Sequence, residues 1–224
     1  TDFPAEKLEE VIPKFHDLDF RISQLTEAVK DDKHQRLNAC QALVDFCFEQ
    51  SEFIIKVAKL VEQLPIQVTH NDTKINNLLF SSHSDKPIAV IDLDTCMPGY
   101  IMNDFGDMVR TCCSNLPEDG KDIENMAVRF DIYEALAEGY VEAFGENISD
   151  LELSSLSIGA QLLPFIIGIR FLTDYLDGDN YFHTEYDAHN LDRAKNQLNF
   201  YRLLKDEESR LSDIIFNVLS EVSP

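Results

Sequence analysis

The sequence predicts a mostly α-helical fold with a small β insertion, of the α+β class. Apolar residues recur at helical spacing through the first third of the chain and again after Asp104. Between these parts, three short apolar runs of strand length are separated by polar residues. A length of 224 residues and a hydrophobic fraction of 44% are sufficient for a buried core. We expect one domain, without repeats or linkers, whose polar residues concentrate in the β insertion.

Two helical stretches are predicted before the β insertion. Apolar residues have helical spacing over residues 18–29 and over a longer stretch from about 34 to 64. Pro65 cannot continue a helix and is expected to end the second stretch.

The β insertion is predicted from three apolar runs at residues 66–69, 78–80 and 88–91. The polar segment 81–86 between the last two runs is typical of a turn. These two strands are therefore expected to follow one another closely along the chain.

Helical periodicity resumes in the last part of the chain. Helices are expected near 104–114, 122–144, 150–177, 187–205 and 207–220. Ser149 and Glu152 have the spacing of a capping box, which predicts a helix start at residue 150. Pro164 is expected to kink that helix.

The segment from His70 to Asn77 carries the most chemical information. It fits the pattern H-x-D-x-x-x-x-N of kinase catalytic loops, with Asp72 at the aspartate position. In that chemistry an aspartate orients the attacking hydroxyl or accepts its proton, and an asparagine oxygen binds magnesium. We predict these roles for Asp72 and Asn77, with His70 in support. The alternative is an ordinary polar turn.

A second acidic group follows at the end of the third predicted strand. Asp92 and Asp94 come after an apolar run and are expected to lie on one face of that strand. Hard oxygen ligands of this kind suit Mg²⁺. We predict Asp92 as a metal ligand, with Asp94 assisting; the alternative for Asp92 is a strand cap.

The tripeptide Asp104-Phe105-Gly106 spells the D-F-G motif of protein kinases, but it opens a predicted helix. A metal ligand at that place would be badly positioned. Asp104 and Asp107 are instead expected to cap the helix or to hold the backbone of the catalytic loop.

The composition excludes several partners. A net charge of -22 repels phosphate backbones and anionic lipids, which argues against nucleic acid and membranes. No apolar run approaches the roughly 20 residues of a membrane span, and no secretory signal is visible. Five cysteines without a C-x-x-C pair predict reduced thiols in a cytoplasmic protein. The oligomeric state is not indicated.

With these residues in view, the chain resembles the aminoglycoside phosphotransferase and choline kinase superfamily. Within it, the sequence looks most like bacterial N-acetylhexosamine 1-kinases. The resemblance is carried by residues 69–80, 90–95, 98–99, 104–107, 170–182 and 189–193.

The resemblance implies a kinase that uses ATP and Mg²⁺ to phosphorylate the anomeric hydroxyl of N-acetylglucosamine or N-acetylgalactosamine. By position, Asp72 would be the base and Asn77 and Asp92 the metal ligands. Arg170 and Tyr181 would line the sugar pocket, where a bidentate donor and an aromatic face suit a sugar.

Taken from the residues alone, Arg170 and Tyr181 have simpler explanations. Arg170 has Asp174 four residues later and could form a helix-surface salt bridge with it. Tyr181 could be an ordinary loop residue.

The sequence departs from the family in one respect. The resemblance implies a nucleotide-binding lobe with a glycine-rich loop, but every glycine falls at residue 99 or later. We expect residues 1–224 to be the C-terminal lobe of a protein-kinase-like fold, with the N-terminal nucleotide-binding lobe absent and with weak ATP binding in isolation.

Other functions are compatible with parts of the sequence. Residues 96–100 resemble the C-x-P-x-R site of sulfatases, although Tyr100 replaces the arginine. A kinase-like lobe could also act as an inactive binding module. Choline and aminoglycoside kinases share the catalytic loop and differ in their pocket; the latter need an acidic cleft, which the net charge could supply.

Overall fold

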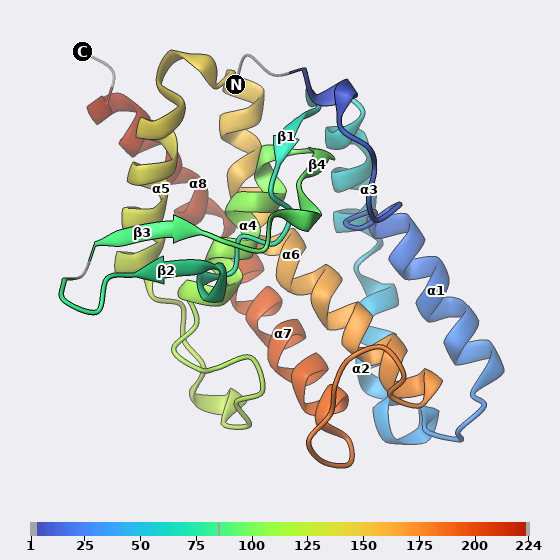
Figure 1. Ribbon diagram of the computed structural model, residues 1–224. Helices are drawn as coiled ribbons and strands as arrows, with labels where there is room; N and C mark the ends of the chain where they lie inside the picture. The colour runs from blue at the N-terminus through green and yellow to red at the C-terminus, as the bar shows by residue number, and fades with distance from the viewer. Residues whose placement is uncertain (1–3, 85, 223–224) are drawn as a thin grey trace.

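Helices dominate the computed structural model, which describes residues 4–84 and 86–222 (Figure 1). The α-helices of this part are Leu18–Asp31 (α1), Leu37–Glu49 (α2), Ser51–Val61 (α3), Ile101–Cys112 (α4), Phe130–Phe144 (α5), Asp150–Asp177 (α6), His189–Asp206 (α7) and Glu208–Val222 (α8). Short 3-10 helices are Ala5–Lys7 (η1), Ile75–Asn77 (η2), Leu93–Thr95 (η3), Ile123–Asn125 (η4) and Gly145–Asn147 (η5). The predicted mostly α class is confirmed.

The β insertion forms two small antiparallel pairs. Their strands are Gln67–Thr69 (β1), Leu78–Phe80 (β2), Pro87–Val90 (β3) and Met97–Gly99 (β4). β2 and β3 form a hairpin in which Leu78 lies opposite Val90. β1 pairs with β4, and Thr69 lies opposite Met97. The chain between β1 and β2, which holds the predicted catalytic loop, is therefore fixed at both ends.

Helix α6 is the central element of the fold. α1, α4, α7 and α8 all pack against it. Its second half belongs to one hydrophobic cluster, with Phe165 next to α1 to α3, and its first half belongs to another, with Leu156 beside α4, α5 and α8. Both clusters of the core therefore share this helix.

One sequence expectation about apolar length was wrong at α6. Among the described residues, this helix is long and apolar enough to cross a membrane. Yet 89% of its most apolar 18-residue window is buried inside the protein, as in a core helix of a soluble protein. Its apolar side chains therefore pack against the other helices.

The helix start at residue 150 was predicted correctly. The Ser149 hydroxyl accepts the backbone N–H of Glu152, and the Glu152 carboxylate accepts the N–H of Ser149, which completes the capping box. The helix continues through Pro164 to Asp177 as one element.

Two other helix boundaries differ from the prediction. The long stretch over 34–64 is two helices, with a break at Gln50, whose side-chain oxygen accepts from Tyr201 and Lys205 of α7. The helix expected over 122–144 begins only at Phe130, because the preceding segment pairs with residues 114–115 through backbone and side-chain hydrogen bonds.

Pro98 and Gly99, a pair typical of turns, are part of strand β4. Glycine is required there, since a Cβ at Gly99 would lie 2.3 Å from the Thr69 hydroxyl oxygen. Strand β4 pairs with β1, which lies thirty residues earlier in the sequence. Turn signals describe only neighbouring residues and therefore do not predict this pairing.

Two glycines allow α4 and α6 to come into close backbone contact. A Cβ at Gly106 would lie 2.1 Å from the carbonyl oxygen of Gly159, and a Cβ at Gly159 would lie 2.0 Å from that of Met102. Real Cβ contacts do not reach such distances, so α4 and α6 would have to separate to admit a methyl group. This close contact fixes the position of α4 along α6, and with it the positions of Asp104 and Asp107.

A Gly159→Ala substitution is therefore expected to lower the free energy of unfolding by about 1–3 kcal/mol, the usual range for overpacking a core. Urea denaturation followed by circular dichroism measures the change. Gly139→Ala is the matched control: nothing lies within 4 Å of a Cβ there, and alanine in mid-helix should raise stability by up to about 1 kcal/mol. Equal effects at both sites would contradict the close-contact account.

Candidate active site

The loop from His70 to Asn77 is anchored by the first turns of α4. The Asp104 carboxylate accepts the backbone N–H of His70 at 2.9 Å and that of Asn71 at 2.7 Å. The Thr73 hydroxyl donates to the Asp104 carbonyl oxygen at 2.6 Å. Of the two alternatives for Asp104, the structure thus shows the contact with the loop backbone, and not the helix cap.

The Asp104 side chain is 9% exposed, and burial raises its pKa to about 6, while the two backbone N–H groups favour the charged form and lower it. At pH 7 the carboxylate is therefore ionised and accepts both hydrogen bonds in their charge-assisted form. The loop is held by a buried negative charge.

The His70 side chain holds the backbone of Asp72. Its Nε2 lies 3.1 Å from the Ile91 carbonyl oxygen and its Nδ1 lies 3.3 Å from the Asp72 backbone nitrogen. Since a carbonyl oxygen only accepts, Nε2 carries the proton and Nδ1 accepts from Asp72. The imidazole links the loop to the end of β3.

Asp72, Asn77 and Asp92 are brought together around Lys74. The Asn77 amide nitrogen donates to the Asp72 carboxylate at 2.8 Å. The Lys74 ammonium lies 2.7 Å from an Asp72 carboxylate oxygen and 4.0 Å from one of Asp92. The three residues predicted to share a site therefore lie within one small polar cluster.

The predicted strand geometry of Asp92 and Asp94 was wrong. β3 ends at Val90, and Asp92 has left-handed backbone angles (φ 64°, ψ 49°) before the 3-10 turn η3, which contains Asp94. The Ile91 N–H donates to the Asn77 carbonyl oxygen at 2.9 Å, which holds this bend beside the loop. The bend, and not strand alternation, directs Asp92 toward Lys74.

Two oxygen groups of the cluster could hold a metal ion. The Asn77 amide nitrogen is directed to Asp72, so its oxygen is available, and the Asp92 carboxylate is exposed. Mg²⁺ in phosphoryl-transfer sites takes one or two carboxylates and keeps several waters, which fits this donor set. Asp94 has no hydrogen bond or ion pair in the described chain. That part of the protein also has no group of three His, Cys, Asp or Glu suited to a metal.

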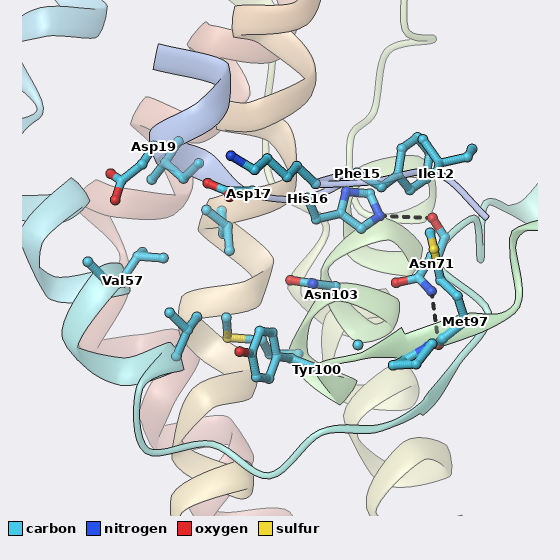
Figure 2. Close-up of a pocket in the computed structure, with 18 of the residues that line it drawn as sticks. Ile12, Phe15, His16, Asp17, Asp19, Val57, Asn71, Met97, Tyr100 and Asn103 are labelled. Atoms are coloured by element: carbon cyan, nitrogen blue, oxygen red, sulfur yellow. Dashed lines mark hydrogen bonds between the residues drawn. The ribbon is translucent and has the colours of Figure 1, made fainter. Parts of the chain in front are cut away.

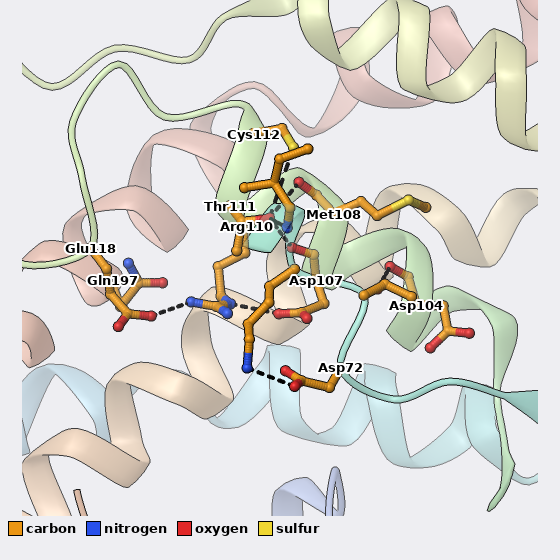
Figure 3. Close-up of polar contacts among 12 residues, drawn as sticks. Asp72, Asp104, Asp107, Met108, Arg110, Thr111, Cys112, Glu118 and Gln197 are labelled. Atoms are coloured by element: carbon orange, nitrogen blue, oxygen red, sulfur yellow. Dashed lines mark hydrogen bonds and ion pairs between the residues drawn. The ribbon is translucent and has the colours of Figure 1, made fainter. Parts of the chain in front are cut away.

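Asp107 lies in a buried ion pair one turn further along α4. The Arg110 Nε donates to the Asp107 carboxylate at 2.7 Å, and Arg110 also binds Glu118. Figure 3 shows this chain of charges next to Asp72. Burial alone would lower the pKa of Arg110, but the two acids outweigh it and raise that pKa. Asp107 therefore holds Arg110, and no hydrogen bond joins it to the loop in the described chain.

Arg170 lies among aromatic rings at the far side of the cluster. Its guanidinium carbon is 5.0 Å from the centroid of Phe15, 5.5 Å from that of Tyr181 and 5.3 Å from that of Phe182. Burial lowers the pKa of Arg170, while interactions with Tyr181 and Asp72 oppose this shift. Arg170 is thus within electrostatic range of Asp72.

The helix-surface salt bridge proposed as the alternative for Arg170 is not formed. The Asp174 carboxylate instead accepts the backbone N–H groups of Asn180, Tyr181 and Phe182 at 2.8–3.0 Å. Asn190 donates to the same carboxylate at 2.9 Å. Asp174 therefore fixes the loop that carries Tyr181.

Arg170 and Tyr181 line one pocket of about 630 Å³. Arg21 and Lys33 belong to the same lining, so with Arg170 three basic side chains lie there beside two acids, Asp174 and Asp177. Tyr181 is 68% exposed, which leaves its ring accessible to a ligand. A pocket of this size accommodates a monosaccharide-sized molecule.

Several residues of the cluster were missed by the sequence reading. Lys74 lies between two carboxylates that the motif identifies: it binds Asp72 in its own loop, and the bend at Asp92 brings the second carboxylate within 4.0 Å. His16 donates from Nε2 to the Asn71 carbonyl oxygen at 2.9 Å from a segment fifty-five residues earlier. The available signal for Lys74 was its place two residues after Asp72.

The pKa of His16 is lowered to about 4, first by burial and also by Arg170 and Arg21, although the bond to Asn71 opposes this. In the unfolded chain a histidine titrates near 6.5. Between these values the unfolded state binds more protons, so stability is lost as the pH falls from 6.5 to 4.

As the pH falls from 6.5 to 4, we expect the free energy of unfolding of the native protein to fall more steeply than that of the His16→Gln variant. The difference between the two slopes should approach about 1.4 kcal/mol per pH unit. Urea denaturation of both proteins at pH 7.0, 6.0 and 5.0 measures it, and other groups titrate equally in both. Parallel curves would show that His16 is not held neutral.

The sulfatase alternative finds no support at Cys96. Met97–Gly99 form strand β4, and Tyr100, at the position of the sulfatase arginine, is the N-cap residue of α4. All five cysteines are free.

A comparison with known protein families gives one match. The model of the family described as "Phosphotransferase enzyme family" (APH) matches residues 6–152. This range contains the loop, Asp92, Asp94, Asp104 and Asp107, and it ends before Arg170.

Proposed function

Since the chain belongs to the phosphotransferase enzyme family, we propose that it transfers the γ-phosphoryl group of ATP to the anomeric hydroxyl of N-acetylglucosamine or N-acetylgalactosamine. The observation that carries the proposal is the convergence of Asp72, Asn77 and Asp92 around Lys74. Residues 1–224 would form the catalytic and substrate-binding lobe.

Asp72 is assigned as the catalytic base. Its carboxylate would accept the hydrogen bond of the acceptor hydroxyl and take its proton as the phosphoryl group is transferred. Asn77 holds that carboxylate by an amide hydrogen bond of 2.8 Å. The Asp104 anchor and His70 keep the backbone of the loop in place, so the carboxylate does not have to be ordered during the reaction.

Lys74 contributes a positive charge between two carboxylates. It reduces the repulsion between Asp72 and Asp92 and is close enough to attract a phosphate group. The Asn77 oxygen and Asp92 would hold Mg²⁺, which neutralises developing charge on the phosphate oxygens when bound. The cations offset the repulsion of a polyanionic nucleotide by a chain with net charge -22.

The β2–β3 hairpin offers a surface for the nucleotide base. Leu79, Phe80, Ile88 and Val90 are 42–66% exposed, which is unusual for four large apolar residues on one hairpin. The hairpin adjoins Asn77, where the phosphates would lie. Because side chains alternate along a strand, a flat purine could cover the part of this apolar surface that lies on one face of the hairpin while its phosphates reach the polar cluster.

The acceptor is assigned to the pocket of Arg170 and Tyr181. Its lining contains three basic side chains, Arg21, Lys33 and Arg170, against two acids, of which Asp174 is bound to backbone and Asp177 is not. A polycationic aminoglycoside is therefore disfavoured relative to an uncharged sugar. The aromatic residues that could cage a choline ammonium already surround the Arg170 guanidinium, which disfavours choline.

The activity is tested with the longest product of the gene, Mg-ATP and a panel of acceptors, following ADP release. The panel contains both N-acetylhexosamines, choline and an aminoglycoside. Release with an N-acetylhexosamine alone supports the proposal. Release only with choline or the aminoglycoside would reassign the pocket, and no release with any acceptor would favour a binding module.

An Arg170→Lys substitution is expected to raise the KM for the sugar at least tenfold, because lysine cannot make the bidentate hydrogen bonds of arginine. The KM for ATP should change little. Steady-state kinetics with each substrate varied measures both constants. Arg193→Lys is the matched control, since Arg193 also lies against an aromatic ring but outside the pocket. Equal effects of both variants would contradict the assignment of Arg170.

A further inference from the structure

A second cavity lies behind the catalytic loop, apart from the pocket of Arg170 and Tyr181. It has a volume of about 240 Å³, opens to solvent on one side, and is bordered by the segment before α1, by α3, by β4 and by the first turn of α4. Most of its walls are apolar side chains, such as Val57, Ala58 and Met102. The proposed reaction uses none of these three residues.

The cavity contains a buried polar side chain without a partner. Asn103 is only 4% exposed, and its side-chain oxygen has no hydrogen bond within the described chain. Figure 2 shows the Asn103 amide in the middle of the lining residues, between the ring of His16 and that of Tyr100. An unpaired oxygen in such a place is costly, unless another molecule donates to it.

A second unpaired acceptor comes from His16. Its Nε2 donates to the Asn71 carbonyl oxygen, so Nδ1 carries no proton and can only accept. Nδ1 is buried and has no partner in the described residues. The two buried side-chain atoms of this lining that lack a partner are therefore acceptors, and the group that satisfies them must donate.

The acids of the lining do not require a cation. The Asp17 carboxylate accepts the N–H of Phe20 at the start of α1, and the Glu10 carboxylate accepts that of Lys14. Asp19, the third acid of the lining, is exposed, and the basic side chain of Lys14 belongs to the same lining. Since the remaining walls are mostly apolar, we expect an uncharged ligand. An apolar cavity of about 150 Å³ is sufficient for benzene, so the present volume admits a substituted six-membered ring.

We propose that this cavity is a second binding site, which takes a small uncharged molecule with an apolar six-membered ring and at least one hydroxyl donor. The hydroxyl would donate to the Asn103 oxygen or to His16 Nδ1, while the ring fills the space beside Val57 and Ala58. Because His16 holds the Asn71 carbonyl, the ligand would also contact the support of Asp72.

The test uses three probes built on one six-membered ring: resorcinol, phenol and anisole, with two, one and no O–H groups. Each is titrated into the ¹⁵N-labelled chain, and the amide shifts of Val57, Ala58 and Tyr100 are followed. We expect each added O–H to tighten binding by about threefold to tenfold. Equal affinities for phenol and anisole, or no binding at millimolar concentration, would overturn the proposal.

Two variants locate the binding. Ala58→Phe should fill the cavity and abolish the shifts, whereas Ala135→Phe on the exposed side of α5 should leave them unchanged. Asn103→Leu should reduce the preference for phenol over anisole; if this variant does not fold, the probe series and Ala58→Phe decide the question. Binding that survives Ala58→Phe would overturn the proposed place.

A final arm separates this cavity from the acceptor pocket. N-acetylglucosamine should not displace phenol, because the sugar is assigned to the pocket of Arg170. Competition between the two would show a single shared site and overturn the second one. None of these measurements depends on ATP or turnover, so the binding results can be interpreted even if the proposed kinase activity is not found.

Discussion

An Asp72→Asn substitution is expected to lower kcat by about a hundredfold to ten-thousandfold, the usual contribution of a general base. The amide is nearly isosteric with the carboxylate and can still accept from Asn77 and Lys74, so the loop should keep its shape. It cannot take a proton from the acceptor hydroxyl. Affinity for ATP should therefore remain largely intact while turnover is lost.

Steady-state ADP release by the longest gene product measures kcat, and nucleotide affinity is measured separately by calorimetry. Asp45→Asn is the control, because it removes one exposed carboxylate from α2, far along the chain from the loop. A variant at residue 72 that kept more than about a third of native kcat, where a base should supply at least a hundredfold, would refute the assignment.

An Asp104→Ala substitution is expected to lower the free energy of unfolding by about 3 kcal/mol at pH 7. The change leaves the N–H groups of His70 and Asn71 without their acceptor, and hydrogen bonds to a charged group contribute about 1.5–3 kcal/mol each. Released from this anchor, the loop should also place Asp72 less well. We expect a lower kcat even under conditions where the variant is fully folded.

Urea denaturation and kinetics of the same preparation test both effects. Asp131→Ala in the first turn of α5 is the control, because this exposed acid has only the helix terminus to stabilise, worth about 0.3–1 kcal/mol. Similar losses of stability in the two variants would contradict the anchoring role of Asp104.

The parts of the fold that depend on local signals were predictable from the sequence. The capping box of Ser149 and Glu152 identified the start of α6 because both partners lie within four residues. The break at Gln50 was not predictable, since its side chain binds Tyr201 and Lys205 in a helix about 150 residues away. Strand β4 was missed for the same reason: its partner β1 is distant in sequence.

The residues of the candidate site also divide into those that local motif spacing predicts and those that only the fold places. The motif spacing identified Asp72, Asn77 and Asp92, which the fold brings together. The approach of Asp92 to Lys74 accompanies a left-handed backbone at Asp92, which no spacing rule includes. Asp174 was considered as a partner of Arg170, yet its carboxylate binds three backbone N–H groups of a loop whose course the sequence does not specify.

The shared position of α6 has a consequence for the order in which the chain folds during synthesis. Helices α1 to α5 leave the ribosome before Asp150–Asp177, but both hydrophobic clusters need that helix to close. Until it emerges, the apolar faces of the earlier helices have no common surface to cover them. We expect nascent chains that end before residue 150 to stay sensitive to protease and to bind chaperones, and chains that extend past α7 to become resistant.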